Sequence, residues 1–303
     1  MSDLKATYCR STATCTSCGA TARLPLHILS KFCKRCKKYY QIEKKASRDL
    51  QKIMRQAKWT HVELPQNLLD AMEGLGLTHN SPDEQVLKQL ILALGQQRVY
   101  SESKLHFRSS FELKGGFASS NFKSKASIKK ALKKNFKSKA SGNVMLPLDP
   151  YEWAPSSLGK ITETELGFRC ETSSKMDFSK PSQTPSSTHP SLGISYFVSR
   201  DGTVISESGP MTGIEVKTTA DLEKWHKLVE TVHQMALQAF EMGIDEGLLI
   251  LMERPLSNNS TTLRFTSVVV GNLLEFHTTA VDSWLASDTE LLKLVNGLGG
   301  RTE

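Results

Sequence analysis

Short apolar segments predict a small sheet in the C-terminal half of the chain. Five segments rich in aliphatic or aromatic residues are separated by stretches that contain Gly, Ser and Asp, a pattern typical of strands. The five expected strands are 194–199, 203–206, 214–217, 248–252 and 263–270. The first two are joined by Arg200-Asp201-Gly202, whose Asp-Gly pair is typical of tight turns, so we expect the two strands to be linked through this turn.

A longer period follows the third strand and predicts a helix. Over 222–240 apolar residues recur every three or four positions, so they form one helix face, more typical of a buried core than of a binding site. Thr218 or Thr219 can cap this helix, with Asp221 in its first turn. A further helical pattern over 281–295 predicts a closing helix.

Three helices are expected over residues 46–100. The first, 47–59, is basic and amphipathic, and the second is 64–75. The third, 84–95, follows the tetrapeptide 81–84 (Ser-Pro-Asp-Glu), a capping-box sequence with proline at the first helical position. Nothing in this segment indicates chemistry, so we expect a small helical layer or a surface for a partner protein.

Five of the six cysteines lie before residue 37, and four of them form two Cys-x-x-Cys pairs. The pairs are Cys15 with Cys18 and Cys33 with Cys36. Each pair can give two thiolates to one tetrahedral zinc ion, so residues 1–45 resemble a zinc ribbon with a structural zinc. Cys9 and His27 are nearby substitute ligands, and a redox dithiol pair or free thiols would be the alternative use. The cysteine usage indicates a reducing compartment, the nucleus or the cytoplasm.

The charge is divided unevenly along the chain. Residues 1–148 hold 27 Lys and Arg against 10 Asp and Glu, whereas residues 149–303 hold 12 against 21. A strongly basic front half favours a polyanionic partner, and nucleic acid is the commonest one. An acidic domain with a basic tail would have the same composition. No apolar stretch reaches the length of a membrane span and no signal-peptide core is seen, so we expect no membrane partner.

Two groups of basic residues are expected to contact phosphates. One surrounds the second cysteine pair and is followed by Tyr39 and Tyr40, which suit base stacking. The other lies within 101–148, where the segment 121–127 (Asn-Phe-Lys-Ser-Lys-Ala-Ser) is repeated at 135–141. The expected contact residues are Lys34, Arg35, Lys37, Lys38, Lys123, Lys125, Lys129, Lys130, Lys133, Lys134, Lys137 and Lys139.

Residues 101–148 are expected to be a lysine-rich linker between the helical segment and an α/β domain at 149–303. Alone it should be disordered, because like charges repel and little can be buried. Against phosphates each lysine would release counterions and add salt-dependent affinity. A nuclear-import signal or a plain linker would use the same residues, and the basic face of the ribbon could instead meet a protein.

Three polar residues of the expected sheet suit metal chemistry. Asp201 lies beside the tight turn, and Glu215 and Lys217 lie two apart on the next strand, so both project from one face. Two carboxylates on neighbouring strands can bind Mg²⁺ or Mn²⁺ through oxygen. A Glu-x-Lys sequence alone is common and usually only solvated, so the turn, the apolar flanks and the following helix and strand are what favour a site.

Four histidines show no metal-ligand spacing and are expected to be surface or boundary residues. They are His189, His226, His233 and His277.

The order of elements resembles the PD-(D/E)xK nuclease superfamily, and within it the phage lambda exonuclease and herpesvirus alkaline nuclease group. The matching motifs are Leu192-Gly-Ile-Ser195, Asp201-Gly202, Ile214-Glu-Val-Lys217 and Gln234-Met235. The resemblance covers residues 160–270 and includes neither the ribbon nor the lysine repeats. Three departures stand against it. Arg200 replaces a proline, residues 196–199 are inserted, and the upstream glutamate is either Glu163 or Glu165.

The resemblance implies a restriction-endonuclease-like fold, an α/β core built on a mixed sheet, and a metal-dependent nuclease that cleaves DNA or RNA. Asp201 and Glu215 would bind Mg²⁺ or Mn²⁺, while Lys217 and Gln234 would act on the attacking water or the phosphate. The alternative, from another class, is a non-catalytic nucleic-acid-binding or regulatory protein, viral in character, whose α/β domain mediates assembly.

Overall fold

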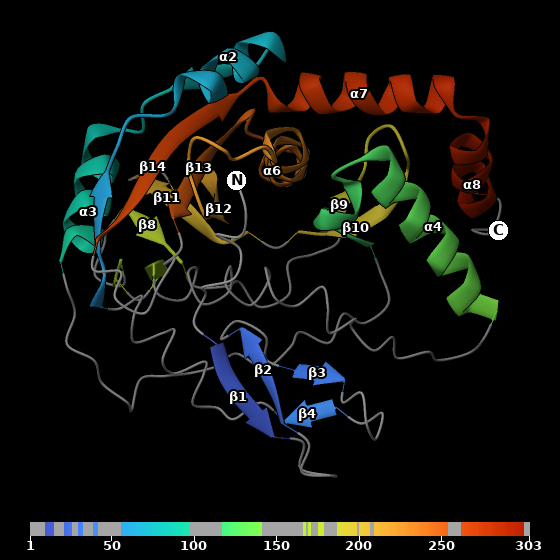
Figure 1. The fold of residues 1–303 in the computed structure, drawn as a ribbon. Helices are drawn as coiled ribbons and strands as arrows, with labels where there is room; N and C mark the ends of the chain where they lie inside the picture. Colours follow the sequence, from blue (N-terminus) through green and yellow to red (C-terminus); the bar gives the residue numbers. More distant parts are fainter. Residues whose placement is uncertain are drawn as a thin grey trace.

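The structure is a computed structural model that describes residues 56–96, 117–140, 166–167, 169–170, 175–178, 187–198, 200–206, 209–253 and 262–299, and the backbone of four short strands before residue 42. The predicted α/β class is confirmed, because the described residues build helices around one mixed, curled sheet of seven strands (Figure 1). Within these described residues, no helix has the length and apolar character needed to cross a bilayer.

The sheet combines segments from both halves of the chain. Its main path runs through β5 (Lys58–His61), β14 (Thr262–Gly271), β13 (Glu246–Glu253), β12 (Gly209–Thr219), β11 (Gly202–Ser206) and β8 (Met176–Asp177). The remaining strand, β6 (Thr78–Asn80), pairs with the C-terminal part of β14. β12 is antiparallel to β11 and parallel to β13, so the chain crosses between β12 and β13 through helix α6 (Leu228–Met242).

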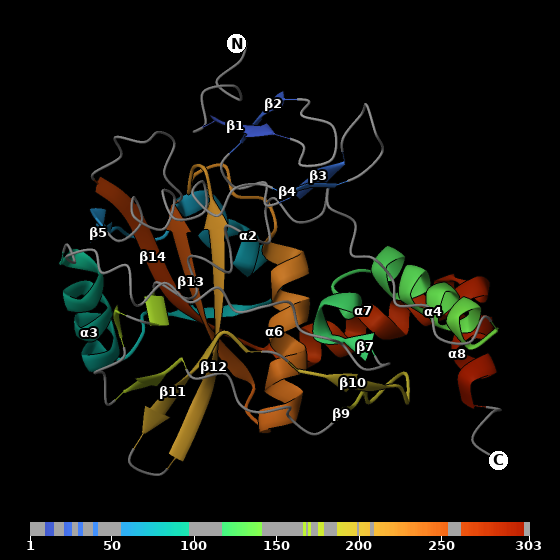
Figure 2. The same cartoon turned by 90° about the horizontal axis from the view of Figure 1, so that it is seen from below.

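Helices cover both faces of the sheet. Alternate strand residues face opposite ways, so each face has its own core. Those packed with α3 (Glu84–Gly95) are Ile214, Val216, Leu248, Ile250 and Met252. Those packed with α2 (Gln66–Gly74) and α6 are Leu249, Leu251, Val268 and Val270. Figure 2 shows α3 and α6 on opposite sides of the strands.

A third core lies beyond α6, on the side away from the sheet. Its elements are β7 (Phe117–Ala118), the 3-10 helix η3 (Ser119–Phe122), α4 (Lys125–Ala140), β9 (Ser187–Thr188), β10 (Ser195–Phe197), α7 (Leu273–Ser287) and α8 (Thr289–Gly299). Phe122, Leu132 and Tyr196 are buried at its centre, and α6 contributes Leu237. Helix α6 is therefore enclosed between the sheet and this third layer (Figure 2).

The longest apolar patterns predicted their elements well. α2, α3, β13 and β14 coincide with the expected elements at 64–75, 84–95, 248–252 and 263–270. The cap of α3 differs from the prediction. Asp83, rather than Ser81, accepts hydrogen bonds from the backbone N–H groups of Gln85 and Val86.

Helix boundaries were predicted less well. β12 continues to Thr219 and α6 begins only at Leu228, so neither Thr218 nor Thr219 caps that helix. The closing helix predicted at 281–295 is two helices. Asp288 separates them, and its carboxylate accepts a hydrogen bond from the backbone N–H of Leu291 in the first turn of α8.

The strands expected at 194–199 and 203–206 are present as β10 and β11, but they do not pair with each other. β10 pairs with β7 and β9 in a separate three-stranded sheet, whereas β11 pairs with β12 and β8. The hydroxyl group of Tyr196 donates to the carbonyl of Leu237 at 3.1 Å, which holds β10 against α6. Asp201 lies immediately before β11.

Two segments predicted as separate units belong to the main fold. Residues 58 and 59, expected to end the helix at 47–59, belong instead to β5 in the sheet, with Trp59 buried. Residues 117–140, expected to be linker, fold into the third core, where Phe122, Ile128 and Leu132 are buried. The lysines around these three residues suggested disorder, but the apolar positions between them suffice to anchor a helix.

Before residue 42, the backbone forms two antiparallel strand pairs, β1 (Arg10–Thr14) with β2 (Thr21–Pro25), and β3 (Ser30–Phe32) with β4 (Tyr39–Gln41). In the sequence, each Cys-x-x-Cys pair falls between the two strands of one pair. The side chains expected to bind zinc and phosphate here lie outside the described residues. They are Cys15, Cys18, Cys33, Cys36, Lys34, Arg35, Lys37 and Lys38.

Candidate active site

Strand β12 places two charged residues on a face of the sheet that is otherwise apolar. Glu215 and Lys217 alternate with the aliphatic residues that pack beneath α3. In the sheet register Glu215 lies beside Leu249 and Lys217 beside Leu251, and both leucines are buried beneath α6. Glu215 and Lys217 therefore lie next to leucines that are packed in the core. Charged residues are rarely buried in such surroundings unless they are paired.

Glu215 is buried, with 1% of its surface exposed, and both carboxylate oxygens are bonded. Oε1 accepts a hydrogen bond from Nζ of Lys217, and Oε2 accepts one from Nε2 of Gln238 at 2.5 Å. The Lys217 side chain is 27% exposed and also donates to Oε1 of Gln234 at 3.2 Å. Desolvating such a pair costs free energy that aliphatic residues would not, which favours a functional role over a purely structural one.

Asp201 joins this pair from the neighbouring strand. Its Oδ2 accepts a hydrogen bond from the backbone N–H of Val216 at 2.8 Å, and its own N–H donates to the carbonyl of Ile214 at 3.1 Å. Val216 lies between Glu215 and Lys217 in the strand. The three residues of the expected motif are therefore gathered at one stretch of β12, although the strands on either side of Asp201 do not pair with each other.

Two glycines allow α6 to approach the sheet closely at this point. A Cβ atom at Gly247 of β13 would lie 2.7 Å from Cε of Met235, and one at Gly213 of β12 would lie 3.0 Å from Oε1 of Gln238. Both separations are shorter than ordinary van der Waals contact, so side chains at these positions would push the helix away. The close approach brings both glutamines of α6 onto the charged residues of β12.

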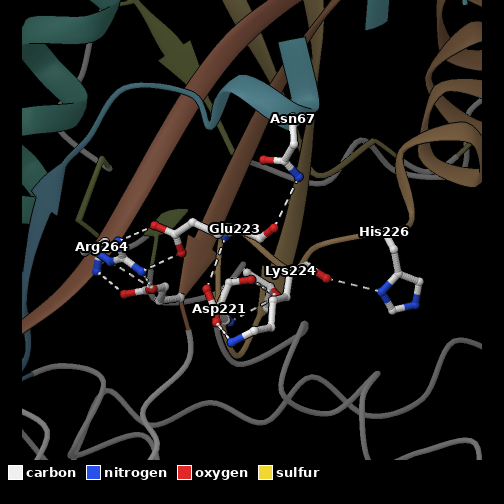
Figure 3. A network of polar contacts seen from close by, with 8 residues as sticks. Asn67, Asp221, Glu223, Lys224, His226 and Arg264 are labelled. Atoms are coloured by element: carbon white, nitrogen blue, oxygen red, sulfur yellow. Dashed lines mark hydrogen bonds and ion pairs between the residues drawn. The ribbon is translucent and has the colours of Figure 1, made fainter. Parts of the chain in front are cut away.

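The turn between β12 and α6 is fixed by a polar network (Figure 3). Arg264 of β14 donates two hydrogen bonds to the carboxylate of Glu223, at 2.7 and 3.0 Å, and a third from Nε to Glu253 at 2.9 Å. Asn67 of α2 donates to the carbonyl of Glu223 at 3.2 Å. The bonds to Glu223 and then Glu253 raise the pKa of Arg264 above its ordinary value. The turn is thereby tied to β13, β14 and α2, which sets where α6 begins.

Several lysines predicted to contact nucleic acid are paired with the chain's own carboxylates. Lys129 of α4 lies 3.0 Å from Asp288 and 2.5 Å from Glu290 at the start of α8, and its bonds to Glu290 and Asp288 raise its pKa. The other pairs are Lys123 with Glu230 at 3.1 Å, Lys125 with Asp288 at 3.9 Å and Lys133 with Glu290 at 2.6 Å. Lys130 is exposed, and the side chains of Lys134, Lys137 and Lys139 lie outside the described residues.

A second polar cluster, which we name the histidine chain, consists of His189, His233 and His277. The prediction that these are surface or boundary residues is wrong, because their exposed fractions are 0%, 1% and 0%. Nε2 of His277 lies 2.8 Å from Nε2 of His189, and Nδ1 of His277 lies 2.8 Å from Nδ1 of His233. Burial lowers the pKa of His189 and His233 to about 4 and that of His277 to about 2, so all three rings are neutral at pH 7.

The geometry of the histidine chain is that of a relay of hydrogen bonds and not of a metal site. A neutral His277 donates from one nitrogen and accepts at the other, so the two bonds share one direction. Nδ1 of His189 has no hydrogen-bond partner among the described residues. An unpaired lone pair is tolerated better than an unpaired N–H, so we assign the direction from His189 through His277 to His233.

The part of the chain that the structure describes holds no group of three or more His, Cys, Asp or Glu residues that could hold a metal ion. Asp201 and Glu215 supply two carboxylates there. The expected upstream ligand, Glu163 or Glu165, lies outside the described residues. Gln238 is the residue of this site that the sequence interpretation missed. Its signal was its position one helical turn after Gln234.

No family model matches this chain, and no curated protein matches it. Among solved structures, the one described as "Crystal structure of SSO0001" is 15% identical, with a TM-score of 0.38, and the match covers 69% of this chain and 84% of that chain. A likeness at this level carries no argument about fold or function. The site must therefore be interpreted from its own residues.

Proposed function

We propose that this chain is a metal-dependent nuclease that hydrolyses phosphodiester bonds of DNA or RNA on a restriction-endonuclease-like core of the PD-(D/E)xK type. The observation that carries the proposal is the ion pair of buried Glu215 and partly exposed Lys217 on a sheet face whose neighbours are leucines. Asp201 adds a carboxylate from the adjacent strand. Aliphatic residues would serve packing at lower cost, whereas phosphodiester hydrolysis needs acids and a cation together.

The donor set fits Mg²⁺ or Mn²⁺. Asp201, immediately before β11, and Glu215 of β12 offer carboxylate oxygens, which are the ligands that these hard cations prefer. When bound, such an ion would polarise the scissile phosphate and lower the pKa of a coordinated water.

The remaining residues have roles that follow from their contacts. Lys217, the cation beside the two acids, can hold the attacking water and offset negative charge that develops on the phosphate. Gln234 accepts a hydrogen bond from Lys217 and so orients its ammonium group. Because Lys217 is partly exposed while Glu215 is buried, the lysine lies on the side from which a substrate can approach.

The basic front half is proposed to deliver nucleic acid to this site. Four thiolates, from Cys15, Cys18, Cys33 and Cys36, would hold one structural zinc ion, and the basic residues beside them would contact phosphates. We expect about one zinc per chain by elemental mass spectrometry of the full-length protein. A Cys33→Ser, Cys36→Ser double variant should lose it, and zinc retained in that variant would contradict the ribbon.

The nuclease proposal is tested with the full chain, Mn²⁺ and end-labelled DNA and RNA. Lys217→Ala should lower the cleavage rate by about 100-fold or more, because it removes the charge next to the reacting phosphate. Lys224→Ala is the matched control, since Lys224 is exposed in the turn before α6 and pairs only locally with Asp221. If wild type and Lys217→Ala show the same background while the protein still binds nucleic acid, it is a non-catalytic binding protein.

A further inference from the structure

Gln238 is a buried polar residue for which the proposed mechanism has no use. It is 2% exposed, and its Nε2 donates to Oε2 of Glu215 at 2.5 Å. We propose that Gln238 is a positioning residue that holds the Glu215 carboxylate for metal binding, while Gln234 serves Lys217 in the chemical step. This inference rests on the proposed nuclease function and divides the two glutamines of α6 between two steps.

The chemistry of the amide suits that role. Glu215 has each oxygen bonded to a different donor, one charged and one neutral, so its carboxylate cannot rotate freely. A neutral donor at residue 238 satisfies the buried oxygen without adding a second positive charge. A lysine or arginine there would compete with a divalent cation for Glu215. Gln238 therefore fixes the acid while leaving the site anionic enough to bind metal.

The hydrogen bond to Glu215 fixes the direction of the Gln238 amide. Its Oε1 is the atom that a Cβ at Gly213 would approach to 3.0 Å, with Cδ of Arg200 and Sδ of Met242 at 3.4 and 3.5 Å from the same point. Reversing the amide would set its oxygen against the Glu215 carboxylate, oxygen to oxygen. The hydrogen bond to Glu215 thus selects one orientation, and Gly213 leaves the room that the Gln238 amide needs.

Gln234 presents the opposite end of its amide to β12. Its Oε1 accepts from Nζ of Lys217, whereas Nε2 of Gln238 donates to Glu215. Residues four apart lie on the same face of a helix. One face of α6 therefore offers a hydrogen-bond acceptor to Lys217 and a donor to Glu215. Losing one glutamine should therefore affect metal binding and losing the other should affect the reaction rate.

The experiment compares Gln238→Met with the matched variant Gln234→Met in the full chain. Mn²⁺ affinity is measured by calorimetry, and the cleavage rate is measured across Mn²⁺ concentrations. Gln238→Met should raise the Mn²⁺ Kd and the half-saturating Mn²⁺ concentration by about 10-fold, with kcat regained at saturation. Gln234→Met should lower kcat by about 10-fold and leave the Mn²⁺ Kd near that of wild type.

Gly213→Ala tests the same assignment without changing either glutamine. Its added methyl group would displace the Gln238 amide, so the variant should also weaken Mn²⁺ binding without lowering kcat at saturation. Circular dichroism checks that each variant is folded, and Gly213→Ala decides the question if Gln238→Met is not. Cleavage by wild type with an unchanged Mn²⁺ Kd in these two variants overturns the positioning role alone. Wild-type protein that neither binds Mn²⁺ nor cleaves overturns the nuclease proposal as well.

Discussion

Helix α6 carries a polar cluster on each of two sides, and the two clusters differ in charge. Toward the sheet, Gln234 and Gln238 contact the ionised pair on β12. Toward α7, His233 joins the histidine chain, whose three rings are neutral at pH 7. Both clusters are largely shielded from water, but only the one on β12 keeps a charged group, Lys217, partly exposed.

The difference shows two ways of burying polar atoms. Neutral rings that bond one another lose little on desolvation, so the histidine chain should stabilise the fold and take no part in chemistry. An ion pair loses much more on desolvation, so the pair on β12 should contribute little or negatively to stability. The proposed metal binding and catalysis would account for the presence of this ion pair in the core. Replacing the histidines should therefore lower the free energy of unfolding, whereas replacing the ion pair on β12 should leave it unchanged or raise it.

Lowering the pH should produce the largest change in stability, and this change should come from the histidine chain. The pKa of each ring is lowered by burial, to about 4 for His189 and His233 and about 2 for His277, so below pH 6.5 the unfolded chain binds more protons than the folded one. Stability is therefore fully present above pH 6.5 and is lost as pH falls toward 4, by about 1.4 kcal/mol per pH unit for each histidine. Urea unfolding at pH 7, 6 and 5 measures the slope.

One charged group near the chain acts in the opposite direction. Burial is the larger cause and lowers the pKa of His189, while Asp282 of α7 raises it. A variant in which all three histidines are leucine should lose most of the slope between pH 6.5 and 5. A slope that persists unchanged in that variant would assign the acid sensitivity to other groups.

Removing only the middle ring is the next largest effect. His277→Leu keeps the volume but leaves Nε2 of His189 and Nδ1 of His233 without their partner, which should lower the free energy of unfolding by about 3 kcal/mol. Urea unfolding at pH 7 gives the value. The variant with all three histidines changed to leucine should be less destabilised than the single variant, because it leaves no nitrogen unpaired. The reverse order would show that packing, not pairing, holds the chain together.

The two clusters also show what a sequence can predict. Glu215 and Lys217 share one strand, and Gln234 follows on the next helix, so periodicity and a motif were enough to group them. The histidine chain comes from three elements. His189 and His277 are 88 positions apart, and His233 and His277 are 44 apart. No spacing rule relates them, since they meet only through the packing of α6, α7 and the segment after β9.

Local sequence patterns gave wrong predictions where tertiary packing determines the structure. The Asp-Gly pair indicated a tight turn between two successive strands, yet β10 lies on the far side of α6, where Tyr196 bonds to Leu237. The lysines of 117–140 indicated a linker, while Phe122, Ile128 and Leu132 fix the segment in a core that β10, α6, α7 and α8 complete. In both cases the deciding contact was made with residues far along the chain, which composition and periodicity do not contain.

A smaller effect of opposite sign is expected on β12. In Glu215→Gln, Lys217→Met the amide oxygen of residue 215 can still accept from Gln238 while both charges are gone. Stability should be unchanged or higher by about 1 kcal/mol, because neither charge of the Glu215–Lys217 pair remains to be desolvated. Cleavage should be lost. Thermal and urea unfolding beside the Mn²⁺ assay report both. A loss of about 3 kcal/mol or more would mean that the ion pair holds the fold together, and the contrast between the two sides of α6 would fail.

The smallest effect concerns a third polar contact of α6, which lies at the surface. Glu230 in its first turn pairs with Lys123 at 3.1 Å, and the two side chains are 45% and 41% exposed. Lys123→Met should lower the free energy of unfolding by no more than about 0.5 kcal/mol, since water already solvates both charges. The difference should vanish in about 1 M NaCl, where the Debye length is about 3 Å. Urea titrations at low and high salt measure it. A larger loss that salt does not reduce would show that exposure does not set the energy of polar contacts on this helix. Burial and charge would then not explain the difference between its two clusters.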